Sequence, residues 1–95
     1  MNNEKHERVV ITALGANKPG VLAGITKTIA ESNVNVEDVT QKIMQDLFAL
    51  MMVTDVAQAN CNFEEFQARM QKSADSLQVK IFIQHEDVFK FMHRL

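Results

Sequence analysis

A short loop near the N-terminus holds the residue types best suited to binding chemistry. Residues 15–21, GANKPGV, contain two of the chain's three glycines and its only proline. Asn17 can hydrogen-bond a ligand or cap a helix, and Lys18 adds a positive charge. Pro19 suits the first turn of a helix, because no amide hydrogen is needed there, and Gly20 leaves the backbone open to close approach. The helix N-terminus expected here would attract a small carboxylate.

Two glycines in the expected helix are not explained by good capping. Gly20 and Gly24 fall within its first turns, on one side of the helix, although glycine is a poor helix former. A close neighbour, either a ligand or another helix, would explain both positions.

Residue types that support catalysis are dispersed along the chain. His6, His85 and His93 lie in the terminal elements and form neither a triad nor a metal-ligand spacing. Glu37 and Asp38 are adjacent on an expected strand, so they point to opposite faces and make a poor acid–base pair. We therefore predict no catalytic residue, no metal site and no cofactor, and a protein that is not an enzyme.

Composition narrows the class of protein and its partners. The chain has 95 residues, of which 46% are hydrophobic, and a net charge of -2, which fits one small globular domain. Its basic residues are scattered among acids, so a nucleic-acid partner is not expected. Cys61 is the only cysteine, and residues 1–7 lack the apolar core of a secretory signal, which favours the cytoplasm. The longest apolar run, residues 47–53, is too short to cross a membrane.

The first half of the chain alternates between strand and helix patterns. Residues 8–14, RVVITAL, are rich in β-branched side chains and predict a strand. Residues 20–32 predict an amphipathic helix that ends near Asn33, a residue that tolerates the left-handed conformation. Its apolar stripe comprises Val21, Leu22, Ile25 and Ile29.

The second half predicts a hairpin, a helix and a further strand. Residues 34–44 and 47–56 form the hairpin, and the first of these strands, which is more polar, suits a sheet edge. Asn62 followed by Glu65 resembles a capping box at the start of the second helix. Residues 78–84 then alternate with the period of a strand.

The last segment, residues 85–95, predicts a short helix. Val88, Phe91, Met92 and Leu95 are spaced i, i+3, i+4 and i+7 and form its apolar stripe. Because so short a helix is unstable alone, we expect this stripe to pack on a surface.

The element order βαββαβ predicts a ferredoxin-like α+β sandwich. Its four-stranded antiparallel sheet has the order 4-1-3-2, with two helices on one face and a short C-terminal helix added. The expected divisions are a disordered tail at 1–7, one domain at 8–84 and the terminal helix at 85–95. The face without helices should be partly apolar and needs a cover: the terminal helix, a second subunit, or both. Candidates for that face, with the register of the third strand undecided, are Val10, Leu14, Phe48, Leu50, Met52 and Phe82.

This fold serves acylphosphatases, RNA-binding modules, metallochaperones and small-molecule sensors. The loop at residues 15–24 has no arginine to hold a phosphoryl group and no cysteine pair to hold a soft metal. Residues 46–53 contain one aromatic residue and no basic residue, unlike an RNA-binding strand. A sensor remains the better match.

At residues 8–84 the chain resembles the ACT domains, βαββαβ modules that sense amino acids and other small metabolites. The serine-sensing ACT domain of phosphoglycerate dehydrogenase carries N-R-P-G-V-L and, at the same separation, V-N-I, where this chain has NKPGVL and VNV. The chain is also similar to the small stand-alone ACT proteins, which lack an assigned biochemical role. A histidine of the serine sensor is replaced here by Gly15, so the resemblance implies a small ligand but not serine.

The resemblance also implies a location for the site. ACT domains pair through edge strands into a continuous sheet, and effectors bind between the first helices. Asn17 and Asn35 are then expected to hydrogen-bond the ligand, with Gly20 allowing its approach. The full expected site is Asn17, Lys18, Pro19, Gly20, Val21, Asn35 and Val36.

Taken together, these patterns predict a cytoplasmic, non-catalytic regulatory homodimer that binds an amino acid or small carboxylate at its interface. It would act on a protein partner that the sequence does not identify. The alternative is a dimerisation or protein-interaction module without a ligand, in which the asparagines only cap and turn the chain. An acylphosphatase is a distant third hypothesis.

Overall fold

The computed structural model describes residues 6–92 as four strands and three helices in one chain. Residues 1–5 of the expected tail lie outside the described residues. The elements are β1 (Arg8–Ala16), α1 (Val21–Glu31), β2 (Asn35–Met44), β3 (Leu47–Asp55), α2 (Phe63–Leu77), β4 (Lys80–His85) and α3 (Glu86–Met92).

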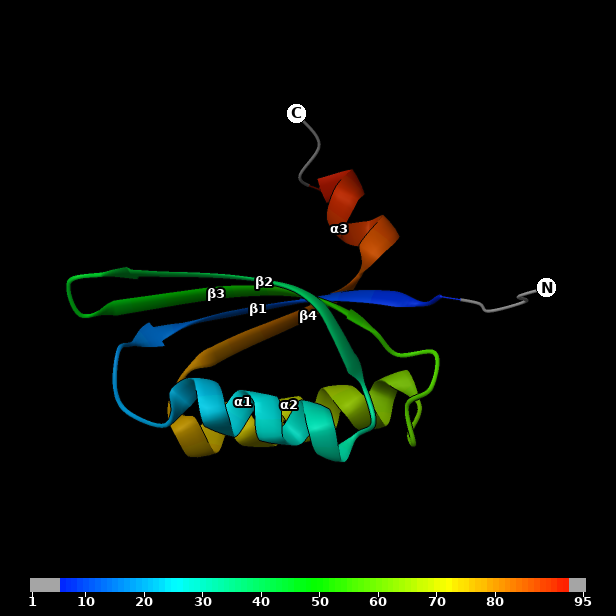
Figure 1. Ribbon diagram of the computed structural model, residues 1–95, viewed down its shortest axis with the longest axis horizontal. Coiled ribbons are helices and arrows are strands. Elements are labelled where there is room, and N and C mark those ends of the chain that lie inside the picture. The colour runs from blue at the N-terminus through cyan, green and yellow to red at the C-terminus, as the bar shows by residue number, and fades with distance from the viewer. Residues whose placement is uncertain (1–5, 93–95) are drawn as a thin grey trace.

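The four strands form one antiparallel sheet in the order β2-β3-β1-β4. This is the predicted ferredoxin-like order read from the other edge, so the predicted fold is confirmed. Helices α1 and α2 cover one face of the sheet, and α3 stands on the opposite face (Figure 1). We call that opposite face the open face.

Helix α1 begins one residue later than the sequence indicated. Gly20 is its N-cap residue, with a left-handed φ of 88°, and no side chain caps the helix. Asn17 and Pro19 therefore precede the helix, and the prediction that they cap it and fill its first turn was wrong. The helix ends as expected, because Asn33 adopts a left-handed φ of 56°.

Helix α2 begins with the predicted capping box. The side chain of Asn62 accepts from the backbone N–H of Glu65 at 2.8 Å, and the Glu65 carboxylate accepts from the backbone N–H of Asn62 at 2.9 Å. Two backbone donors that the helix itself cannot satisfy are thereby paired.

The core lies between the sheet and the two covering helices. Strand side chains alternate between this core and the open face, as the cross-strand register requires. The buried set from β1, β3 and β4 comprises Val9, Ile11, Ala13, Phe48, Leu50, Met52 and Ile81, and it meets Val21, Ile25, Ile29, Phe66, Met70 and Ala74 of the helices.

The register of β3 decides which apolar side chains reach the open face. Met52 pairs with Ile11, and both are buried under the helices, so Phe48 and Leu50 also face the core. Those three β3 residues are therefore not on the open face. The apolar side chains that β1, β3 and β4 place on the open face are Val10, Leu14, Leu47, Ala49, Met51, Val53 and Phe82.

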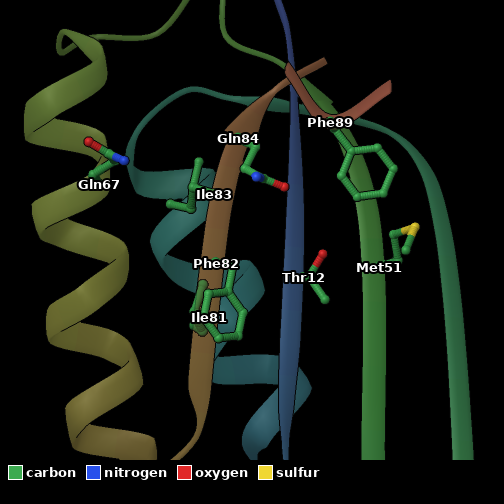
Figure 2. A pocket seen from close by; sticks show the side chains of 8 residues that line it. All are labelled: Thr12, Met51, Gln67, Ile81, Phe82, Ile83, Gln84 and Phe89. Carbon is green, nitrogen blue, oxygen red and sulfur yellow. The ribbon is translucent and has the colours of Figure 1, made fainter. Parts of the chain in front are cut away.

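Helix α3 follows β4 without an intervening loop, so the end of the strand sets its direction. Phe89 is half-buried on the open face, near Thr12 and Met51 (Figure 2). Val88 and Phe91, by contrast, are 49% and 74% exposed. The stripe that was expected to pack on a surface is therefore not buried on the chain's own sheet at these two residues, and the Met92 and Leu95 side chains lie outside the described residues.

Candidate functional site

The loop before α1 is tied to two other parts of the chain. The backbone N–H of Asn17 donates to the carbonyl oxygen of Asp46 in the β2–β3 turn at 2.7 Å. The Lys18 Nζ donates at 3.0 Å to Oε1 of Gln78, the C-cap residue that follows α2. Asn17, Lys18 and Pro19 are all exposed, so the loop is held in place while its side chains face solvent.

The N-terminus of α1 has the electrostatics of an anion site. Its N-cap residue supplies no side-chain oxygen, and no acidic residue lies in its first turn. The positive end of the helix dipole is therefore not neutralised by the chain itself. Val21, the first helical residue, is only 2% exposed, so it can offer a ligand its backbone but not its side chain.

Both glycines of α1 are explained by the chain itself. Gly20 has a positive φ, which L side chains rarely adopt, and a Cβ there would meet nothing within 4 Å. A Cβ on Gly24 would lie 2.8 Å from Cδ2 of Leu77 in α2. The close neighbour expected from the sequence is therefore α2 at Gly24, and at Gly20 the backbone conformation alone requires glycine.

Asn35 and Val36 lie at the other end of the molecule. Asn35 begins β2 and pairs with Asp55, which in turn pairs with Arg8 at the start of β1. The loop with Asn17 follows the end of β1, eight residues further on, or roughly 26 Å along the strand. A single chain therefore does not bring the two asparagines together (Figure 1).

Val36 has a different environment from Asn35. It is half-buried and packs against the hydrophobic core, whereas Asn35 is exposed. Like Val21, it can position the site but presents no polar side chain to a ligand.

The sequence did not reveal the charged cluster beside Asn35. His6 Nδ1 lies 2.6 Å from Oδ2 of Asp55, whose other oxygen accepts from the backbone N–H groups of Glu7 and Ala57 at 3.1 and 3.0 Å. The His6 hydrogen bond is the largest of several contacts that lower the pKa of Asp55 to about 2. Only the strand register, which joins residues 49 positions apart, could have indicated this contact.

A second ion pair lies in the same cluster. A register shift between Val36 and Asp38 gives β2 a bulge at Glu37, whose carboxylate accepts from Arg8 Nε at 2.7 Å. Ligand atoms of His6, Glu37 and Asp55 lie within 4.8 Å of one another. Because Arg8 neutralises Glu37, and His6 and two amides satisfy Asp55, these contacts form an ion-pair network that holds the N-terminal residues to the sheet.

Strand β2 is an edge with most of its length accessible. Nine of its ten residues are exposed, and Val39 and Ile43 are 46% and 50% exposed on the side of the helices. Since α2 contacts β4 at the far edge, α1 lies toward β2. A long accessible edge with exposed apolar side chains is a template for pairing with another strand.

A wide hollow lies elsewhere, at the β4 edge beneath α3. It has a volume of about 560 Å³, and its lining includes Phe82, Phe89 and Gln67 (Figure 2). It does not include the asparagines of the expected site. Among the helices of residues 6–92, none has the length and apolar character to cross a membrane.

A family model described as the ACT domain matches residues 7–84. The chain is 41% identical over 88 residues to a UPF0237 protein of Methanopyrus kandleri, covering 93% of this chain and 98% of that one. It is also 41% identical over 88 residues to a UPF0237 protein of Listeria monocytogenes, covering 93% and 99%.

Solved structures agree with the family match. An ACT domain protein from Streptococcus pneumoniae superposes with a TM-score of 0.77 at 28% identity, covering 90% of this chain and 97% of that one. The regulatory subunit of aspartate kinase from Thermus thermophilus shares the fold with a TM-score of 0.65 at 12% identity, covering 82% and 50%.

Proposed function

The chain belongs to the ACT-domain family, and from this premise we propose that it is a non-catalytic regulatory protein that binds an amino acid or small carboxylate between two copies of itself. ACT domains are typically regulatory and ligand-binding, and the match at residues 7–84 spans every strand of the sheet except His85 at the end of β4. The proposed site comprises Asn17, Lys18, Pro19, Gly20, Val21, Asn35 and Val36.

The positions of Asn17 and Asn35 carry the proposal. They lie at opposite ends of α1, whose eleven residues span about 16 Å. If two copies pair through their β2 edges about a two-fold axis, their α1 helices run antiparallel side by side. Asn17 of one copy then approaches Asn35 of the other, so the second copy completes the site.

The chemistry of the two half-sites suits a carboxylate. The uncapped N-terminus of α1 offers backbone N–H donors. Lys18 donates to the neutral side chain of Gln78 in the free chain and can donate to a ligand carboxylate instead. The amides of Asn17 and Asn35 can both donate and accept, which allows either end of an amino acid to be bound. Open space beside Gly20 leaves room for the ligand.

Regulation requires that the ligand prefer one state of the protein. A ligand that contacts both copies favours the dimer over separate chains, and a dimer surface can then be recognised by a regulated protein. We place this activity in the cytoplasm and assign no catalytic residue.

One observation favours the alternative, a dimerisation module without a ligand. The left-handed Gly20 and the contact between Gly24 and Leu77 account for both unusual glycines with no ligand present. In that case the β2 edges of two copies still pair, and Asn17 and Asn35 only help the backbone to turn.

Thermal melts of the purified protein against a panel of amino acids and small carboxylates distinguish the two functions. A ligand at about a hundred times its Kd stabilises the folded state by about 2.7 kcal/mol, which raises Tm by several degrees in a domain of this size. Asn17→Ala and Asn35→Ala should each abolish the shift. If no compound shifts the melt, the ligand-free module is the better reading, and a shift that survives both variants would place the site elsewhere.

A further inference from the structure

Helix α3 has apolar side chains on two opposite sides. Phe89 is half-buried against the chain's own open face. Phe91 lies two positions further on, roughly 160° around the helix, and is 74% exposed. Val88 and Asp87 lie on the same outward side as Phe91 and are exposed as well. A helix in which both sides are apolar suits a layer between two surfaces.

Only one half of the open face is covered by α3. Val10, in the half near α3, is 4% exposed, whereas Leu14, four residues further along β1 on the same face, is 40% exposed. Met51 and Phe82 pair with Thr12 and line the hollow beside Phe89, at the border of the covered half, yet they are still 40% and 54% exposed. The half of the open face toward the β2–β3 turn is therefore apolar and accessible.

Lysines flank this accessible half. The register sets Lys42, Ala49, Leu14 and Lys80 in one row across the four strands, with a lysine on each edge strand. The outward side of α3 carries the opposite charge at Asp87, beside Val88 and Phe91, because the exposed Lys90 of the same helix pairs with Glu86. The two surfaces are thus complementary both in apolar character and in charge.

We propose that the outward side of α3 packs on the accessible half of the open face of a second copy, and that the second copy's α3 does the same in return. Phe91 and Val88 lie over the partner's Leu14, Met51 and Phe82, and Asp87 lies toward the flanking lysines. Each α3 is then a spacer between two sheets, with Phe89 against its own sheet and Phe91 against the other.

A second copy is the occupant because one chain carries both complementary surfaces, at opposite halves of the same face. A two-fold axis across the strands sets each α3 over the other chain's uncovered half, and so both are covered at once. This contact uses the open face, whereas the side-by-side pairing of the proposed function uses β2 and α1. The two contacts are compatible, and together they give a tetramer.

The test measures mass in solution, by light scattering after size exclusion and by native mass spectrometry. Wild type should be a tetramer, and Phe91→Asp or Phe82→Asp should each reduce it to a dimer. Both positions are more than half exposed, and far-UV circular dichroism checks that each variant folds. Lys72→Asp, on the exposed side of α2, is the matched control and should leave the mass unchanged.

Mixing the two variants gives the decisive measurement. A pair that contains one Phe91→Asp chain and one Phe82→Asp chain has one intact contact of the two, so an equimolar mixture should partly recover the larger species. A wild-type mass that neither variant reduces would overturn the proposal, as would a mixture that recovers nothing.

These mass measurements test the α3 contact separately from the ligand site of the proposed function. A ligand-induced melt shift that persists in Phe91→Asp supports both contacts. A mass that falls from dimer to monomer in this variant supports the α3 contact and counts against side-by-side pairing. If both variants have the same mass as wild type, something other than a second copy occupies the open face, and the inference is overturned.

Discussion

Leu77 of α2 occupies the space that a side chain at Gly24 of α1 would need, its Cδ2 lying 2.8 Å from the position of that Cβ. The two helices approach closely at this point because one of them lacks a side chain there. The atoms that block the position belong to the far end of a flexible, half-buried side chain, which can move aside.

Gly24→Ala should therefore change the free energy of unfolding by less than about 1 kcal/mol. Alanine gains about 1 kcal/mol in helix propensity, and displacing Leu77 offsets that gain. In a Leu77→Ala background the gain should appear in full. Urea titrations of the four proteins in this cycle measure the coupling, and equal effects of Gly24→Ala in both backgrounds would show that the two residues do not interact.

Gly20→Ala should destabilise the protein by about 1–2 kcal/mol although nothing obstructs its Cβ. The cause is the left-handed backbone, with φ at 88°. Asparagine tolerates this region better, so Gly20→Asn should lose less stability than Gly20→Ala. Chemical denaturation of both variants checks the order, and the reverse order would mean that the space beside residue 20 matters more than its φ.

Stability should fall in acid partly through Asp55. Its pKa is lowered from 3.8 to about 2 in the folded chain, so its contribution is present above about pH 4 and is lost as the pH falls toward 2. We expect a loss of about 1 kcal/mol, because His6 is 45% exposed and solvent weakens its share.

Unfolding free energies between pH 5 and pH 2 measure this loss. Asp55→Asn and His6→Gln should both flatten that part of the curve, whereas Glu31→Gln, which removes an exposed carboxylate on α1, should not. If the unfolding free energy of Asp55→Asn falls with pH as steeply as that of wild type, other groups cause the acid sensitivity.

The capping box of α2 should contribute about 1 kcal/mol to the free energy of unfolding. Asn62→Ala removes the oxygen that accepts from Glu65 N–H, and Asn62→Asp keeps an acceptor in the same place. Urea denaturation followed by far-UV circular dichroism should therefore rank wild type and Asn62→Asp above Asn62→Ala. Equal losses in both variants would point to the amide nitrogen instead.

The β2 edge supplies a prediction about assembly. Val39→Lys puts a charge on a residue that is 46% exposed in one chain but lies at the proposed side-by-side contact. It should weaken that contact at least tenfold, as measured by the protein concentration at which the pair dissociates. Lys72→Asp serves again as the control, and an unchanged dissociation would remove β2 from the interface.

The fold could be predicted because each element has its own periodic pattern and a local boundary signal. Asn62 with Glu65 marks the start of α2, and Asn33 marks the end of α1, through interactions between residues close in sequence. The side of β3 that faces the core could not be predicted, because Met51 and Met52 make both sides apolar. Only pairing with β1 decides it.

The surroundings of the candidate site were predicted less completely than the fold, because they also depend on contacts between residues distant in sequence. Pro19 and Gly20 suit a first helical turn by type, yet φ at Gly20 excludes that residue from the helix. The contact of His6 with Asp55 depends on strands that meet only in the folded chain. Which side of α3 faces the sheet follows from its direct junction with β4, which a spacing of apolar residues does not encode.

If the proposed site is correct, each separate chain has two incomplete halves of it, because Asn17 and Asn35 lie at opposite ends of α1. Binding is then linked to association, and the apparent affinity for the ligand rises with the amount of protein present. At low abundance the chain would ignore a metabolite that it detects at high abundance. Expression level, as well as metabolite level, would therefore set the response.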